Sequence, residues 1–132
     1  INDESQEEKK LVDYSTLKLF NLQVNSSNKE DVLQTMKEKS SVTIEDPSSN
    51  KFIYDDVGLI FHFNKNSRID AITITFPSKE ATIKGLKIDD SIDKAIELYG
   101  HPVMRTLSAA RWKNLSVFLN DNVITSLRLK DY

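Results

Sequence analysis

The two histidines are the side chains of this sequence that are best suited to proton transfer near neutral pH. His62 lies between Phe61 and Phe63 in a segment of alternating apolar residues, so its ring is predicted to face away from them. There it could act as a base or a contact residue, and a purely solvent-facing role is the alternative. His101 directly follows a predicted helix end, where the helix dipole favours a cation. Neither histidine is predicted to be catalytic.

Two pairs of adjacent carboxylates, Asp55-Asp56 and Asp89-Asp90, could contribute to a calcium site. Neither lies in the Asp-x-Asp-x-Asp-Gly loop that such sites commonly use, so we interpret them as turn and helix-cap residues. The sequence contains no cysteine, which removes thiolate chemistry and disulfides. It also lacks a glycine-rich phosphate loop, a His-Glu-x-x-His motif and a nucleophile elbow. We therefore predict a protein that is not an enzyme and holds no cofactor or metal ion.

Composition and charge narrow the function classes further. Of 132 residues, 39% are hydrophobic, and 18 basic residues nearly balance 20 acidic ones, giving a formal net charge of -2. This near balance lacks the excess of positive charge that is typical of nucleic-acid-binding domains, so no nucleic-acid partner is predicted. No apolar run approaches the ~18 residues that are needed to span a bilayer. Contact with a membrane is predicted only through a lipid anchor preceding Ile1.

The beginning of the sequence has the composition of a tether. Residues 1–10 are polar and charged, with no signal-peptide core and no initiator Met. We interpret residues 1–15 as a leader and the chain as the mature region of an exported precursor, with an arbitrarily bounded cytosolic protein as the alternative. Residues 16–77 and 78–132 are then two repeats within one compact domain.

The first half predicts a helix followed by antiparallel strands. Ser27 and Glu30 match a capping box, in which side chains bond the free backbone N–H groups of a helix start, and this helix should end near Lys39. A short apolar lead-in precedes the helix, and strands follow a loop of turn-forming residues. These segments are the lead-in at 17–24, the loop at 46–50, strands over 52–63 and 69–76, the hairpin at 64–67 between them, and a stop at Pro77.

The second half repeats this order. Ser91 offers an N-cap, apolar residues recur at helical spacing from Ile92 to Tyr99, and Gly100 is placed as the helix stop. The other predicted segments are a lead-in at 83–88, strands at 103–107, 111–119 and 123–129, and a tight turn at 120–122.

The two halves share a register of apolar residues, which indicates an internal duplication. Each half alone would bury too little apolar surface to be stable, so both should share one core. The matched pairs are Leu22 with Leu86, Val24 with Ile88, Val32 with Ala95, Leu33 with Ile96, Leu59 with Leu115, Phe61 with Val117, Phe63 with Leu119, Asn64 with Asn120, Ile69 with Ile124, Ile72 with Leu127, and Ile74 with Leu129, with one extra residue in the first helix cap.

This register predicts an α+β protein: two tandem α-then-antiparallel-β units forming one mostly antiparallel sheet with the helices packed on one face. The predicted core comprises the apolar helix faces together with Leu59, Phe61, Phe63, Ile72, Ile74, Val117, Leu119, Leu127 and Leu129.

The segment Gly85-Leu86-Lys87-Ile88-Asp89-Asp90-Ser91, followed by Tyr99-Gly100-His101-Pro102, resembles a recurrent segment of Gram-positive exported lipoproteins. In that segment a glycine and two alternating apolar residues precede Gly-Asp-Ser, and Tyr-Gly-x-Pro follows. Asp89 of this chain stands where that segment has the glycine of Gly-Asp-Ser. The tandem arrangement is also similar to the beta-lactamase-inhibitory-protein fold and to the small outer-membrane assembly lipoprotein domain. The resemblance implies a sheet with an open, protein-binding face, and no functional residue of either family can be placed on this chain.

Aromatic and apolar residues on the outward side of the strands form the predicted binding site. If Leu59 and Val117 face the core, their strand neighbours Ile60, His62 and Phe118 face outward, and Tyr54 and Trp112 precede these strands. The favoured function is a non-enzymatic extracytoplasmic binding module for a protein or a cell-envelope component, as the soluble part of a surface lipoprotein. A small-ligand-binding or enzymatic domain with a pocket near His62 or His101, and a structural spacer, are the alternatives.

Overall fold

The computed structural model of the chain describes residues 16–41 and 43–132, and within them it contains two helices and ten strands. Eight strands form one antiparallel sheet and two form a small separate hairpin. The fold is thus mixed, with the antiparallel sheet dominant, and it agrees with the α+β class in this broad form. The predicted leader at 1–15 lies outside the described residues.

The elements follow one another with short connections, apart from one long loop between β6 and α3. In chain order they are β1 (Lys18–Leu19), β2 (Leu22–Gln23), α2 (Lys29–Met36), β3 (Ile44–Asp46), β4 (Lys51–Tyr54), β5 (Leu59–Phe63), β6 (Ile69–Thr75), α3 (Ile92–Tyr99), β7 (Met104–Arg105), β8 (Ala109–Arg111), β9 (Leu115–Asn120) and β10 (Val123–Lys130).

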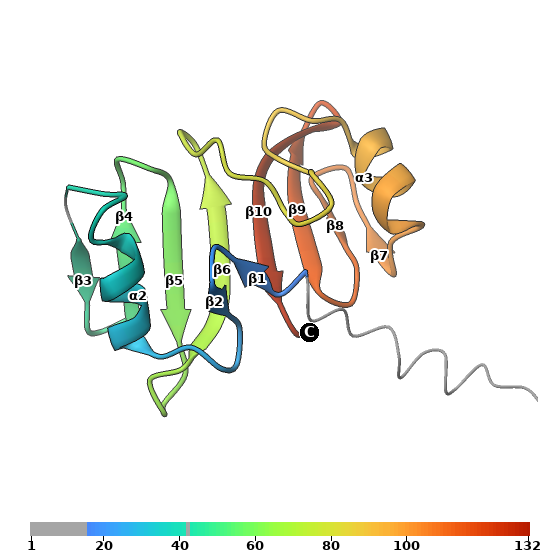
Figure 1. Cartoon of the computed structure of the whole chain (residues 1–132). Coiled ribbons are helices and arrows are strands. Elements are labelled where there is room, and N and C mark those ends of the chain that lie inside the picture. The colour runs from blue at the N-terminus through green and yellow to red at the C-terminus, as the bar shows by residue number, and fades with distance from the viewer. Residues whose placement is uncertain (1–15, 42) are drawn as a thin grey trace, which may run out of the picture.

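The large sheet has the strand order β3-β4-β5-β6-β10-β9-β8-β7, and every pairing in it is antiparallel. Each helix is followed by four strands that pair in chain order, and the last strands of the two sets, β6 and β10, join at the centre. Figure 1 shows α2 and α3 on the same side of this sheet, over its two ends.

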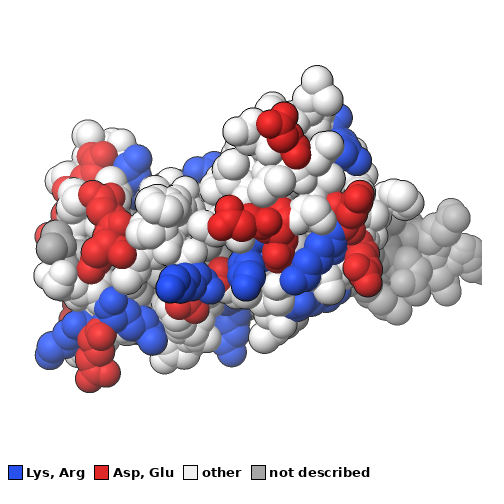
Figure 2. Space-filling model, turned by 90° about the horizontal axis from the view of Figure 1, so that it is seen from above, with Lys and Arg blue, Asp and Glu red and all other residues white. Residues whose placement is uncertain are grey.

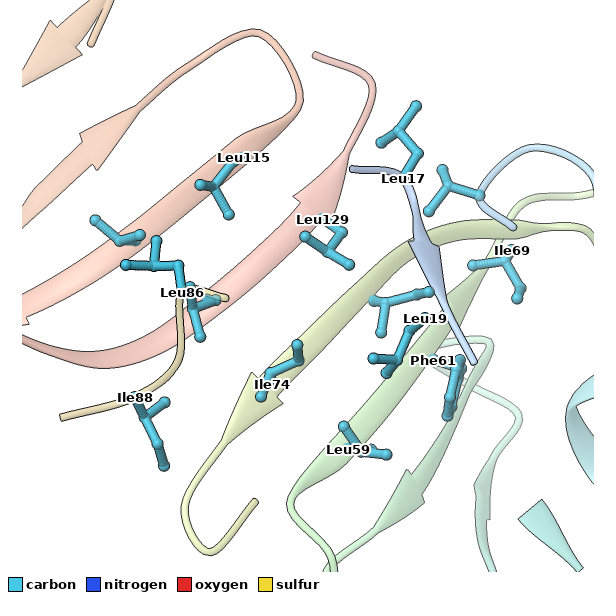
Figure 3. Close-up of a cluster of buried hydrophobic side chains, with 14 of the residues drawn as sticks. Leu17, Leu19, Leu59, Phe61, Ile69, Ile74, Leu86, Ile88, Leu115 and Leu129 are labelled. Carbon is cyan, nitrogen blue, oxygen red and sulfur yellow. The ribbon is translucent and has the colours of Figure 1, made fainter. Parts of the chain in front are cut away.

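One hydrophobic core lies between the sheet and the elements that cover it. Val32 and Met36 of α2 and Ile92 and Ala95 of α3 belong to it. Figure 3 shows the lead-in side chains packed over those of the sheet. All nine predicted core residues of the strands are buried: Leu59, Phe61, Phe63, Ile72, Ile74, Val117, Leu119, Leu127 and Leu129.

The start of the first helix is displaced by one residue from the prediction. Asn28 is the N-cap, its side chain accepts the backbone N–H of Asp31, and the Asp31 carboxylate accepts the N–H of Asn28. The hydroxyl oxygen of Ser27 instead accepts the backbone N–H of Gln23 at 2.9 Å. The helix also ends at Met36, earlier than predicted.

The second helix follows the prediction closely. Ser91 is the N-cap and accepts the backbone N–H of Lys94 at 3.2 Å. The helix spans Ile92–Tyr99 and ends at Gly100, where φ is 82°. A side chain disfavours this left-handed backbone region, so glycine is suited to the position.

The predicted strand at 111–119 is wrong as a single element. A turn between Trp112 and Leu115, in which the Trp112 N–H donates to the Leu115 carbonyl at 2.7 Å, separates β8 from β9. The small hairpin of β1 and β2 and the edge strand β3 were also not predicted. The tight turn between β9 and β10 is confirmed, with positive φ at Asp121 and Asn122.

Equivalent backbone hydrogen bonds attach the segment before each helix to the sheet. Asn25 donates its N–H to the Ile69 carbonyl at 2.6 Å, and Asp89 donates to the Ile124 carbonyl at 2.8 Å. Asn25 and Asp89 both have positive φ, 68° and 76°. Glycine would suit the position of Asp89, because glycine adopts positive φ without steric cost.

Candidate functional site

The candidate site is the sheet surface turned away from α2 and α3, which we call the open face. Its residues alternate with the core residues along each strand, so paired residues on neighbouring strands share it. None of the described helices covers it (Figure 1). Its middle row, fixed by the strand register, runs from Ile53 and Ile60 through Thr73 and Arg128 to Ser116 and Arg111.

Three polar side chains meet at the centre of the open face. The Nε2 atom of His62 lies 3.0 Å from Oγ1 of Thr73. The Nη2 atom of Arg128 lies 3.4 Å from the same imidazole nitrogen, and Nε of Arg128 donates to Thr73 Oγ1 at 3.4 Å. Because arginine can only donate, Nε2 of His62 must accept, and the imidazole proton is then on Nδ1.

The electrostatic environment favours the neutral form of His62. Burial is the largest cause of the lowered pKa, which falls from 6.5 to about 4, and the positive charge of Arg128 is the second. Lys51 and Lys130 lower the pKa further, while the carboxylate of Asp70 opposes the shift. At neutral pH the ring therefore carries no charge, and Arg128 supplies the positive charge at the centre.

Further cations surround this centre. Lys51 is paired with His62 in the strand register. Lys130 forms an ion pair with Asp70 at 2.9 Å. Arg111 lies with its guanidinium 5.3 Å from the centre of the Tyr132 ring. The open face therefore carries basic side chains over both halves of the sheet.

Apolar side chains complete the open face on the β7–β9 side. Phe118 is 42% exposed and lies opposite Ala109 in the register. Met104 at the sheet edge is also exposed, and Leu107 at the β7–β8 turn is 93% exposed. Ile60 on the β5 strand is half-buried among its neighbours. The predicted site residues Ile60, His62 and Phe118 thus lie on one face, with Phe118 nearest to this apolar end.

The other two predicted site residues, Tyr54 and Trp112, do not belong to the open face. Tyr54 is buried in the core, with its ring 5.9 Å from that of Phe61. Trp112 is also buried, and its Nε1 donates to the carbonyl oxygen of Gly100 at 2.8 Å. The alternation of the strand could have revealed this for Tyr54, because it shares the parity of the buried Phe52.

The charged residues of the open face were missed because sequence reasoning followed the aromatic residues. Arg128 and Lys130 alternate with the core residues Leu127 and Leu129, and this parity places them outward. Their proximity to His62 depends on the pairing of β5, β6 and β10, which alternation within one strand does not give.

His101 lies apart from the site and is exposed. A small surface depression of about 80 Å³ lies near the start of α2 and the β3–β4 loop, and neither histidine lines it; its residues are Lys29, Glu45, Asp46, Pro47, Asn50, Lys51 and Phe52. Within the described ranges, no three His, Asp or Glu residues form a group that could hold a metal ion.

A comparison with protein-family models found no match, and comparisons with curated proteins and with solved structures found none either. In the part of the chain that the structure describes, no helix is long and apolar enough to cross a membrane. Viewed from above, acidic and basic side chains are interspersed (Figure 2).

Proposed function

We propose that this chain is a non-enzymatic binding module that recognises a protein or a cell-envelope component through the open face. The observation that carries the proposal is the combination of Phe118, 42% exposed, with half-buried cations on a sheet surface that no described helix covers. Protein-binding surfaces are enriched in aromatic residues and arginine. The histidine at its centre is neutral at pH 7 and contacts Thr73 and Arg128.

The proposal includes an internal duplication that gave two tandem α-then-β units. It is supported by the register of the hairpins: Phe63 pairs with Ile69 in the first, and Leu119 pairs with Ile124 in the second. Each hairpin also has one register shift, located next to those pairs. The residues of these two pairs are the ones that the alignment of the two halves matches with one another. Apolar periodicity alone does not predict that both hairpins have a register shift at the same place.

We further propose an extracytoplasmic location, as the soluble part of a bacterial surface lipoprotein. The lipoprotein-like segment beginning at Gly85 supports it, and the positive φ of Asp89 fits the glycine of that segment. Protease treatment of intact cells that express the full precursor tests the location. Cleavage in intact cells is expected, and cleavage only after lysis contradicts the proposal.

Site-directed photo-crosslinking tests recognition through the open face. A benzophenone amino acid replaces Phe118 or Ile60 and, as a control, Leu33 of α2, which is exposed to a similar degree as Phe118. Full-length protein bearing each probe is irradiated in envelope preparations. We expect discrete adducts from the two open-face positions and not from Leu33, because the helix side is turned away from the partner.

Adducts of equal yield from Leu33 and Phe118 would refute recognition through this face. Absence of adducts from both open-face positions, in protein that unfolds at the normal urea concentration, would refute the binding module itself and favour a structural spacer.

A further inference from the structure

The open face carries more positive than negative charge, although the whole chain is slightly acidic, with 20 acidic against 18 basic residues. Its cations are Lys51, Arg111, Arg128 and Lys130, placed there by the strand register. Two carboxylates share this face: Asp70 is paired with Lys130 at 2.9 Å, and Asp46 lies opposite Lys51 in the strand register. The four cations outnumber these two carboxylates, so the surface has a positive character that the composition of the whole chain does not show.

Arg128 at the centre has no carboxylate partner among the described residues. The three ion pairs in that part of the chain involve other side chains. Its side-chain hydrogen bonds are with neutral groups, Thr73 Oγ1 and His62 Nε2, both at 3.4 Å. A guanidinium has five N–H donors in a planar fork, so Arg128 retains donors for a bidentate carboxylate. Because the side chain is only partly exposed, a carboxylate bound there would be partly shielded from water.

The spacing of the cations suits an extended chain. Arg128 lies two strands from Arg111 and three strands from Lys51. With strands about 4.8 Å apart, Arg111 is roughly 10 Å from Arg128 between backbone positions; Lys51 lies two residues along its strand from the row of Arg128, so its separation is roughly 16 Å. Alternate residues of an extended peptide lie about 7 Å apart and point the same way. Acidic residues at alternate positions can therefore meet these cations through their flexible side chains.

We propose that the partner presents an acidic polypeptide segment that lies across the open face, with one carboxylate bound to Arg128 and an apolar residue against Phe118. This inference rests on the proposed function and adds the chemistry of the partner. A polypeptide is favoured over a lipid surface because Arg128 is half-buried among its neighbours, where a single carboxylate side chain of an extended chain can reach its guanidinium. The exposed ring of Phe118 supplies an apolar contact at one side.

Fluorescence anisotropy with defined probes tests the inference. The probe is a labelled peptide of alternating Glu and Ser that ends in Leu, and the control peptide has Lys in place of Glu. The full chain is expected to bind the acidic peptide, with affinity falling as salt is added. Arg128→Gln should weaken binding about tenfold or more, since a charge-assisted bidentate contact is lost.

Arg105→Gln is the matched control, because Arg105 pairs with the buried Ala110 and lies on the other side of the sheet. It should leave the affinity unchanged. Equal loss in both variants would show a non-specific charge effect and overturn the inference. Urea unfolding of each variant excludes loss of the fold as the cause.

Other occupants of the open face are separate outcomes. Vesicles of phosphatidylglycerol bound in an Arg128-dependent way, without peptide binding, would overturn a polypeptide partner. Concentration-dependent dimerisation that Arg128→Gln abolishes would assign the face to a second copy of the chain. If the peptide does not bind but the probe at Phe118 still gives discrete crosslinks, the acidic partner alone is refuted. If those crosslinks are absent as well, the binding module is refuted.

Discussion

Acidification should weaken the fold through His62. The pKa of this imidazole is lowered from 6.5 to about 4, first by burial and then by the charge of Arg128. Between those pH values the unfolded chain binds more protons than the folded one, so the free energy of unfolding falls as the pH falls through this window. A shift of this size corresponds to at most about 3.4 kcal/mol. Because the ring is partly exposed, we expect roughly 1–2 kcal/mol.

Urea unfolding at a series of pH values measures this contribution as the difference between the parent chain and His62→Gln. The difference is needed because hydrogen bonds from serine residues also lower the pKa values of Asp46 and Asp56, which adds an acid-induced loss of stability. The parent should lose more stability than His62→Gln between pH 6.5 and 4, and the two curves should run parallel above pH 6.5.

A titration followed by NMR gives the pKa of His62 directly. Replacing His101 by Gln leaves one imidazole signal to follow. Arg128→Gln should raise the pKa of His62, because it removes the positive charge that lowers this pKa most. A folded-state pKa near 6.5 in the parent, or no change in Arg128→Gln, would refute the description of the centre of the open face.

Three further substitutions test the fold that supports the site. Gly58→Ala should lower the free energy of unfolding by about 3 kcal/mol or more, because a Cβ would lie 2.1 Å from a backbone carbonyl oxygen of β6. Gly85→Ala is the control, since Gly85 also has positive φ but has open space around it, and urea unfolding should show a smaller loss. Equal losses in the two variants would contradict the clash at Gly58. Trp112→Phe should cost about 1–2 kcal/mol, because the carbonyl of Gly100 loses its indole donor, and an unchanged unfolding midpoint would show that this bond contributes nothing. Asp89→Gly should raise stability by up to about 1 kcal/mol by relieving the left-handed backbone, and a loss of stability would mean that the side chain has a role of its own.

Alternation of apolar residues predicted much of the sheet. Leu59, Phe61 and Phe63 face the core as expected, and so do Leu127 and Leu129. The signal is reliable here because one face of the sheet is buried, so a shift of one residue would expose every core side chain of the strand.

Elements fixed by local hydrogen bonds were less predictable. Ser27 and Asn28 are both competent N-cap residues; in the fold Asn28 caps the helix, and the Ser27 hydroxyl accepts the N–H of Gln23. The break between β8 and β9 contains neither glycine nor proline, and its turn is closed by the backbone bond from Trp112 to Leu115. Such contacts depend on the folded geometry and leave little trace in composition.

The candidate site was predictable only in part, for a related reason. Parity along single strands placed Ile60, His62 and Phe118 outward, but it gives no information on which strands are neighbours. The contact of His62 with Arg128 joins residues from strands far apart in sequence and requires β6 between them. The aromatic residues Tyr54 and Trp112 were assigned to the surface by residue type, and their burial shows that residue type is weaker evidence than strand parity.

Under the proposed duplication, the centre of the sheet is also where the two halves meet. Thr73 pairs directly with Arg128, and each follows a matched core residue, Ile72 in one half and Leu127 in the other. Equivalent residues that pair with one another lie on the local two-fold axis, so this axis passes between Thr73 and Arg128.

The core positions around this axis remain apolar in both halves, but the outward positions differ. Arg128 stands opposite its equivalent Thr73, and the position that His62 has in one half is Phe118 in the other. Had both halves kept the same outward residues, the open face would be symmetric and could not favour one direction of a bound chain. With a cation at the axis and an exposed aromatic ring on one side, the face has a polarity, and an extended partner can bind it in a single orientation.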